Sequence, residues 1–278
     1  MITLKNITYK IGQKTILEDI SVNFEPSKLH LIIGANGAGK STLIKLICNQ
    51  IKATKVNGTE GTILYENQES KIISISEFAR NRAVLSQNIE LAFPLKVHEV
   101  VMMGRYPHFG AAATQKDYQA IEEAMDFFGV MEMAEREYLT LSGGEKQRVH
   151  FARVMAQIWN FSFSNTSNST KNSKLKNRYL ILDEPLTFLD VRYQFEFMHK
   201  VTELLKQKDL VVIGVVHDLN LAAKFADQIV LLSDSKILAA GTKEEVLTKE
   251  NIKKAYSLEP VIHTDFRNDK NEMYLFFE

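Results

Sequence analysis

The residues best suited to chemistry form one octapeptide, Gly34-Ala35-Asn36-Gly37-Ala38-Gly39-Lys40-Ser41, which Thr42 follows. It fits the pattern G-x-x-x-x-G-K-[ST]. The glycines let the backbone wrap so that successive N–H groups point at phosphate oxygens, and a helix start adds positive potential. Lys40 is placed to neutralise β- and γ-phosphates, and the Ser41 hydroxyl is placed to hold Mg²⁺. The pattern therefore predicts a nucleotide-phosphate site.

A second candidate group stands at the end of the apolar run Tyr179-Leu180-Ile181-Leu182-Asp183-Glu184. At the carboxyl end of a strand, Asp183 is placed to hold Mg²⁺ through water. Glu184 is placed to orient and deprotonate an attacking water. Many strands end in an acidic turn, so this pair gains its meaning from the phosphate loop, which needs such a partner.

The elements that must position these groups alternate between strand and helix patterns. An apolar run over 29–33 stops at Gly34, and 41–50 shows a helical pattern in which Cys48 is expected in the core. Strand patterns at 179–182, 210–216 and 228–232 follow a helical stretch from about 97 to 157. The order predicts an α/β fold whose parallel-sheet core is interrupted by a helical subdomain.

Composition narrows the class of protein. The 278 residues hold 34 Lys plus Arg and 34 Asp plus Glu, so no basic excess favours nucleic-acid binding. The single cysteine, Cys48, excludes an internal disulfide and indicates a reducing compartment. No signal peptide is visible, and no apolar run approaches the ~20 residues of a membrane helix. A soluble, intracellular chain is expected.

Two stretches lie outside the catalytic pattern. Residues 160–177 are rich in Asn, Ser and Thr and predict a flexible surface insertion, because such residues cannot offset their ordering entropy by burial. Beyond the main domain at 1–250, the segment 251–278 forms a short extension. Its strand-like runs 261–266 and 273–277 flank a polar stretch and predict a β-hairpin.

Further motifs give the chain a family resemblance over about residues 2–250. Leu141-Ser142-Gly143-Gly144-Glu145-Lys146-Gln147-Arg148 resembles the signature motif of the ABC ATPases and precedes the acidic strand, as in that family. Gln87 resembles the Q-loop, Leu189-Asp190 the D-loop, and His217 the switch histidine. The resemblance implies a P-loop NTPase (RecA-like) core with a parallel sheet, an antiparallel β subdomain and an inserted α-helical signature subdomain.

The resemblance also implies how the residues share the work. Two chains would sandwich two ATP molecules, and Asp190 would belong to the dimer interface. Gln87 would contact Mg²⁺ and the attacking water, and His217 the γ-phosphate or that water. The γ-phosphate of the other subunit's ATP would be bound by the signature residues Leu141, Ser142, Gly143, Gly144 and Glu145. From the residues alone, this motif opens a helix whose N–H groups and hydroxyl can receive an anion.

Two positions depart from the family pattern. The family often stacks an aromatic residue on adenine just before a glycine, but here Ile11 precedes Gly12 and the nearest aromatic is Tyr9. Either Tyr9 reaches the ring or the base rests on aliphatic surface. In the D-loop, Leu186 follows Pro185 where Thr or Ser is common. This change is expected to alter communication between sites without abolishing hydrolysis.

A single cassette without coiled coils or a tandem copy resembles a transporter subunit. The resemblance implies docking on two transmembrane permease subunits at the cytoplasmic face of the inner membrane, with a periplasmic or surface substrate-binding protein acting indirectly. The runs 91–94, 104–108 and 217–223 resemble importers of iron-siderophore, cobalamin and haem, and 152–159 with the insertion resembles haem (hemin) importers. Ferric-siderophore or cobalamin import is the alternative.

Other functions are less favoured. A non-transport ABC ATPase is the weaker alternative, and a binding-only module is disfavoured because Lys40, Glu184 and His217 are all present. None of the seven histidines is expected to bind haem, since the substrate would pass through the permease.

Overall fold

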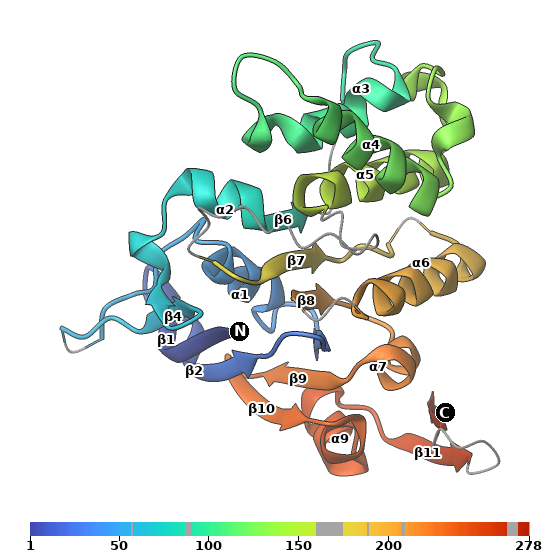
Figure 1. Cartoon of the computed structure of the whole chain (residues 1–278). Helices are drawn as coiled ribbons and strands as arrows, with labels where there is room; N and C mark the ends of the chain where they lie inside the picture. Colours follow the sequence, from blue (N-terminus) through green and yellow to red (C-terminus); the bar gives the residue numbers. More distant parts are fainter. Residues whose placement is uncertain are drawn as a thin grey trace.

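The chain folds around two sheets and a group of helices (Figure 1). The computed structural model describes residues 1–56, 58–86, 91–159, 175–187, 189–206, 209–265 and 272–277. The strands are β1 (Ile2–Ile11), β2 (Lys14–Phe24), β3 (Leu29–Gly34), β4 (Thr62–Tyr65), β5 (Gln68–Glu69), β6 (Arg82–Leu85), β7 (Arg178–Asp183), β8 (Leu210–Val215), β9 (Gln228–Ser233), β10 (Lys236–Gly241), β11 (Pro260–Asp265) and β12 (Glu272–Phe277). The α-helices are α1 (Lys40–Ile47), α2 (Ile75–Asn81), α3 (Val97–Met102), α4 (Gln115–Phe127), α5 (Gly143–Ile158), α6 (Val191–Leu204), α7 (Leu219–Phe225), α8 (Lys243–Val246) and α9 (Lys249–Tyr256). Short 3₁₀ helices cover Ser70–Ile72, Met103–His108, Met131–Met133 and Tyr138–Thr140.

The larger sheet has the strand order β10-β9-β3-β8-β7-β6. All its neighbours pair in parallel except β10, which runs antiparallel to β9. Every residue of β3 and β8 is buried, as expected for strands covered on both faces. Because the strands are parallel, the carboxyl ends of β3, β7 and β8 meet at one edge, where ligands bind in open α/β sheets.

The smaller sheet, β2-β1-β4-β5, is antiparallel. One buried cluster joins side chains of β1, β2 and β4 to those of α1 and to one face of the larger sheet. Helix α1 therefore lies between the two sheets, as Figure 1 shows. The parallel core, the antiparallel sheet and the inserted helices confirm the α/β fold predicted from the sequence.

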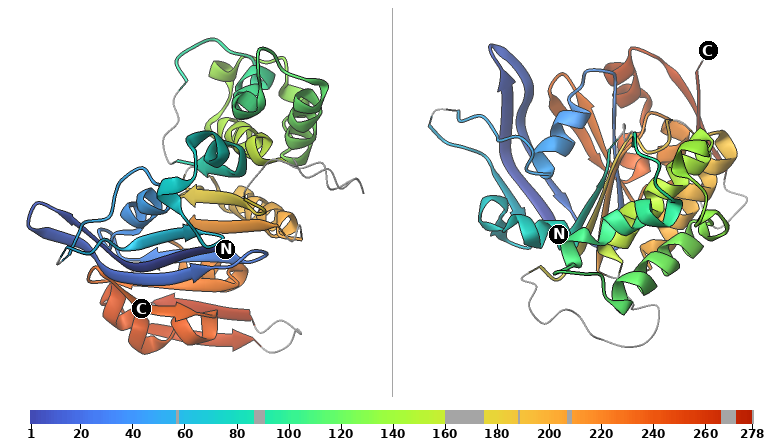
Figure 2. Two further views of the ribbon diagram at one scale, coloured as in Figure 1. Left: turned by 60° about the vertical axis from the view of Figure 1, so that its left-hand side comes forward. Right: turned by 90° about the horizontal axis from the view of Figure 1, so that it is seen from above.

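Helices α3, α4 and α5 pack together beyond the β6 edge of the larger sheet, whereas α9 and β11 lie at the opposite end (Figures 1 and 2). A buried ion pair joins this helical region internally, with Arg105 Nη2 3.0 Å from Asp117 Oδ1. Gly104 sits directly against the carbonyl oxygen of Arg153 in α5, so a Cβ at this position has no room. The run 104–108 therefore packs against both α4 and α5.

The C-terminal strands β11 and β12 pair antiparallel from Pro260 opposite Phe277 to Asp265 opposite Glu272. Strand β12 packs on α7, and Leu275 belongs to the main buried core. Among the described residues, no helix is long and apolar enough to cross a membrane.

Most of the predicted insertion, 160–174, lies outside the described residues, but its last three residues are held in place. Leu175 is buried, and the carboxylate of Glu66 accepts hydrogen bonds from the backbone N–H groups of Lys176 (2.9 Å) and Asn177 (2.6 Å). Glu66 also accepts from Asn177 Nδ2 (2.7 Å) and from the hydroxyl of Tyr179 (3.0 Å). Residues 176 and 177 are therefore tied to a distant carboxylate, and a flexible insertion over 160–177 stays a prediction.

Candidate ATP site

The phosphate loop joins β3 to α1, and its backbone needs glycine. Gly37 has φ 82° and Gly39 has φ 99°, both in the left-handed region. A Cβ on Gly39 would come within 2.7 Å of Leu17 Cδ2 and 3.0 Å of the Ile16 oxygen in β2. The smaller sheet thus supports the loop from behind, at the turn that opens α1.

The Lys40 side chain lies within this loop. Only 5% of Lys40 is exposed, and its Nζ donates to the carbonyl oxygens of Gly34 (2.8 Å) and Ala35 (3.1 Å). Burial lowers the pKa of the Lys40 ammonium, whereas the charges of Glu184 and Asp183 act in the opposite direction. Both carboxylates therefore act electrostatically on the ammonium.

Asp183 ends β7 and faces the start of α1. Its carboxylate is hydrogen-bonded to Ser41, while its Oδ1 is buried and has no hydrogen-bond partner in the described part of the chain. Burial and the charge of Glu184 raise the pKa of Asp183, against the effects of Lys45, Ser41 and Lys40. A buried carboxylate oxygen beside a serine hydroxyl is a donor set that suits Mg²⁺, which prefers hard oxygen ligands.

Glu184 and His217 meet at the ends of the neighbouring strands β7 and β8. His217 Nε2 lies 2.9 Å from Glu184 Oε1. Glu184 has φ 52°, an uncommon conformation for a residue with a side chain, and the Thr187 hydroxyl donates to its carbonyl oxygen at 3.1 Å. This turn aims the carboxylate toward the imidazole, so the structure brings together five predicted residues: Lys40, Ser41, Asp183, Glu184 and His217.

Two other predicted residues bear on the base and the metal. Tyr9 pairs with Leu17 in the β1–β2 ladder and packs partly buried against the core beside α1. Ile11, at the position where the family often has an aromatic residue, is 62% exposed. A contact of Tyr9 with adenine stays a prediction. Gln87 lies outside the described residues.

The signature residues lie at the start of α5, in the helical region. The Ser142 hydroxyl accepts from the N–H of Glu145 at 3.3 Å, and Glu145 Oε2 accepts from the N–H of Ser142 at 2.8 Å. This reciprocal cap fixes the first turn of the helix. Leu141 is buried beneath it, and among the described residues a Cβ built on Gly143 or Gly144 would meet no atom within 4 Å beyond its chain neighbours and the backbone of its own helix. The turn therefore presents an open backbone surface.

Asp190 serves as the N-cap of α6. Its Oδ1 accepts from the N–H of Tyr193 at 3.0 Å, which fixes the residue where the loop after β7 enters the helix. Its role at a dimer interface stays a prediction.

One contact between α5 and the turn after β7 is not predicted by the sequence. The side-chain amide of Gln147 in α5 donates to the carbonyl oxygen of Pro185 at 2.9 Å. It connects the signature helix to the residue directly after Glu184. Gln147 belongs to the quoted signature run, but no local pattern indicates a partner 38 positions away.

A lysine-bearing loop between strand and helix, with an acidic strand end and a histidine beside it, defines a P-loop nucleoside triphosphatase. Comparison with known proteins narrows this class. The ABC transporter family model matches residues 17–161. A hemin import ATP-binding protein, HmuV, of Methylobacillus flagellatus is 36% identical over 91% of this chain and 87% of the relative. The HmuV of Gloeobacter violaceus is 38% identical over 94% of this chain and 89% of the relative. The chain belongs to the ABC transporter family and is an ABC-type ATPase.

Solved structures support the fold. The chain superposes on an ABC transporter in an inward-facing conformation with a TM-score of 0.78, at 21% identity, over 100% of this chain and 97% of the other. The dimeric structure of MJ0796, a bacterial ABC transporter cassette, gives a TM-score of 0.69 at 23% identity. The superposition covers 87% of this chain and 98% of the other.

Proposed function

We propose that this chain is the ATP-hydrolysing subunit of a hemin importer. The observation that carries the proposal is the match to two proteins named hemin import ATP-binding protein, at 36% and 38% identity over more than nine-tenths of the chain. The subunit works as a dimer docked on two permease subunits at the cytoplasmic face of the membrane. A substrate-binding protein delivers hemin on the opposite side.

The phosphate loop binds ATP through its backbone N–H groups and Lys40. The ammonium exchanges its bonds to the Gly34 and Ala35 oxygens for phosphate oxygens, so a buried cation is paired in either arrangement. Ser41 and Asp183 would hold Mg²⁺, and the support for this is the buried Asp183 Oδ1, which has no hydrogen-bond partner among the described residues. When bound, Mg²⁺ neutralises charge on the β- and γ-phosphates.

Glu184 accepts the proton of the attacking water, and His217 orients that carboxylate and the γ-phosphate. The 2.9 Å contact between His217 Nε2 and Glu184 Oε1 supports this division of roles. The family resemblance implies that Gln87 would contact the metal and the attacking water.

The open first turn of α5 supports a role for the signature in the partner's site. Its N–H groups receive the γ-phosphate of ATP held by the other subunit, because a helix N-terminus favours negative charge. ATP thus bridges Lys40 of one chain and Ser142 of the other, and hydrolysis reopens the dimer because ADP lacks the bridging phosphate. The closed state is favoured only by this difference in contacts.

The test is growth of the source organism with hemin, and separately with ferric siderophore, as the only iron source. The strains carry the intact gene, Lys40→Ala, or Lys52→Ala as a matched control at an exposed lysine. Loss of growth on hemin alone in the Lys40→Ala strain, with equal protein levels, is the expected result. Loss only on siderophore would overturn the hemin assignment in favour of a siderophore importer, and growth on both would overturn a role in iron uptake.

A further inference from the structure

The switch histidine is joined directly to helix α7. Asp218, the next residue, is the N-cap of α7 and accepts from the N–H groups of Asn220 (2.7 Å) and Leu221 (3.1 Å). No flexible residue separates His217 from this cap. The orientation of the first turn of α7 therefore sets where the imidazole lies relative to Glu184.

Asn220 fastens that first turn to the C-terminal strand β12. Its Oδ1 accepts from the N–H of Leu275 at 2.7 Å, and its Nδ2 donates to the carbonyl oxygen of Leu275 at 3.1 Å. One amide thus satisfies both backbone groups of a strand residue, as a neighbouring strand would. The side chain of Leu275 is itself buried in the main core.

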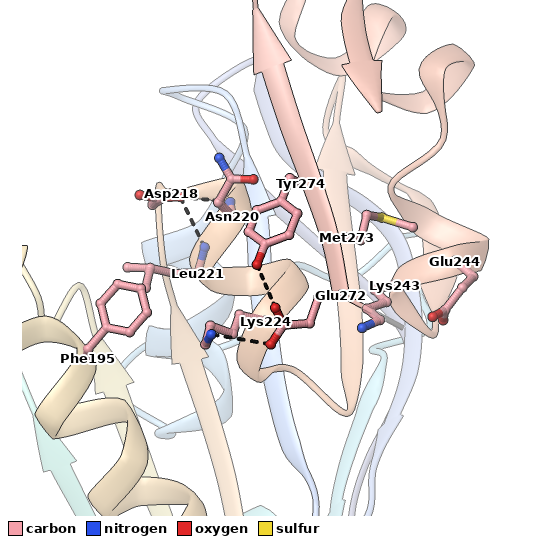
Figure 3. A pocket seen from close by; sticks show the side chains of 10 residues that line it. All are labelled: Phe195, Asp218, Asn220, Leu221, Lys224, Lys243, Glu244, Glu272, Met273 and Tyr274. Atoms are coloured by element: carbon pink, nitrogen blue, oxygen red, sulfur yellow. Dashed lines mark hydrogen bonds and ion pairs between the residues drawn. The ribbon is translucent and has the colours of Figure 1, made fainter. Parts of the chain in front are cut away.

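A second link joins the same two elements one helical turn further on. Lys224, four residues after Asn220 and on the same face of α7, lies 3.6 Å from Glu272 Oε1. The hydroxyl of Tyr274 donates to Glu272 Oε2 at 2.6 Å. Figure 3 shows Asn220 and the Lys224–Glu272–Tyr274 chain beside a cavity of about 650 Å³.

The cavity lies beside the two links between α7 and β12, which are made by Asn220 and by Lys224. It lies between α7, β12 and α8 and is also lined by Phe195 of α6. Space beside β12 means that packing alone limits movement between the helix and the strand less than in a filled core. Leu219 and Leu221 of the first turn are buried in the core, and the hydrogen bonds of Asn220 add a direct link from this turn to β12.

We propose that strand β12 holds the switch histidine in place through Asn220, which makes Asn220 a positioning residue for ATP hydrolysis. The inference rests on the role proposed above for His217. Without the amide, the first turn of α7 shifts relative to β7 and β8. The His217–Glu184 contact then loosens, and a displacement of about 1 Å is enough to lower a reaction rate severely.

The test uses the full-length chain with the substitution Asn220→Ala, measuring ATP hydrolysis, nucleotide binding and the thermal midpoint. A partial displacement of His217 predicts a fall in kcat of about tenfold. The KM for ATP should change less than about twofold, because the phosphate loop is untouched. Asn251→Ala is the matched control, since its amide donates to the Val246 oxygen at 3.0 Å on a different helix. It should keep the normal kcat.

A double-substitution cycle separates positioning from general stability. If Asn220 acts through His217, adding Asn220→Ala to His217→Ala should not lower kcat further. An unchanged kcat for Asn220→Ala at temperatures where it is folded, or additive losses in the cycle, would overturn the inference. Normal hydrolysis by His217→Ala alone would instead overturn the role of His217. If Asn220→Ala does not fold, Lys224→Met weakens the second link and should lower kcat by a smaller factor at constant KM, whereas an unchanged kcat would count against the inference.

Discussion

The buried pair Arg105–Asp117 allows a quantitative prediction for the substitution Asp117→Ala. Asp117 Oδ1 accepts from Arg105 Nε at 3.1 Å and Nη2 at 3.0 Å, and Oδ2 accepts from the N–H (2.8 Å) and hydroxyl (2.6 Å) of Thr114 at the start of α4. Removing one partner of a buried ion pair costs about 3–5 kcal/mol, because the remaining charge is left uncompensated. The lost cap of α4 adds about 1 kcal/mol.

We therefore expect the free energy of unfolding of Asp117→Ala to fall by about 5 kcal/mol and its thermal midpoint by about 10 °C. Urea unfolding followed by circular dichroism measures the first quantity. Asp126→Ala is the matched control on the exposed side of the same helix, and it should stay within about 0.5 kcal/mol of the wild type. The double variant Arg105→Leu with Asp117→Ala removes both charges and should lose less than Asp117→Ala alone.

The pH dependence gives a second check. Burial alone would raise the pKa of Asp117, but hydrogen bonds from Thr114 and Arg105 hold it below its usual value. The stabilisation is therefore complete above the ordinary aspartate pKa of about 4 and is lost as the pH falls further. The difference between wild type and Asp117→Ala should be constant from about pH 5 to 8 and shrink below about pH 4. A difference under about 1 kcal/mol at pH 7 would refute the reasoning.

Three further predictions concern single residues. Glu184→Gln should bind ATP, accumulate as a closed dimer in size-exclusion chromatography and lose at least about 100-fold in kcat, whereas normal hydrolysis would contradict its role as base. Burial lowers the pKa of His30, so stability should hold above about pH 6.5 and fall as the unfolded chain takes up the proton below it. In urea titrations at several pH values, His30→Gln should reduce this fall of the unfolding free energy below about pH 6.5. An unchanged fall would count against His30 as its cause. Burial raises the pKa of Cys48 to about 11, so its thiol should resist a disulfide reagent at pH 8 until guanidinium unfolds the chain, and fast reaction in buffer would disprove this.

The local chemistry of the site could be predicted from the sequence, because its motifs carry their own context. The strand before Gly34, the helix after Ser41 and the acidic end of β7 follow from short patterns. The parallel sheet then brings those strand ends to one edge, and the 2.9 Å contact of His217 with Glu184 follows from β7 and β8 being neighbours.

The supports of the site could not be predicted in the same way, because each is a contact between residues far apart in the chain. Glu66 bonds residues about 110 positions away, and Asn220 bonds Leu275 across 55 positions. Arg105 was noted only for its resemblance to importer sequences, whereas the structure gives it a buried partner in Asp117. One amide or carboxylate carries no periodic pattern that would indicate such a partner.

The residues on both sides of 160–174 are held by hydrogen bonds to distant carboxylates, which bears on engineering of this segment. On one side Trp159 Nε1 donates to the carboxylate of Glu123 at 2.6 Å. On the other side, just before β7, the carboxylate of Glu66 accepts from the backbone N–H groups of Lys176 and Asn177. Tension or bulk introduced between these two anchors is borne by Glu123 and Glu66 before it reaches Asp183. We therefore expect changes of length within 160–174 to leave ATP hydrolysis nearly unchanged.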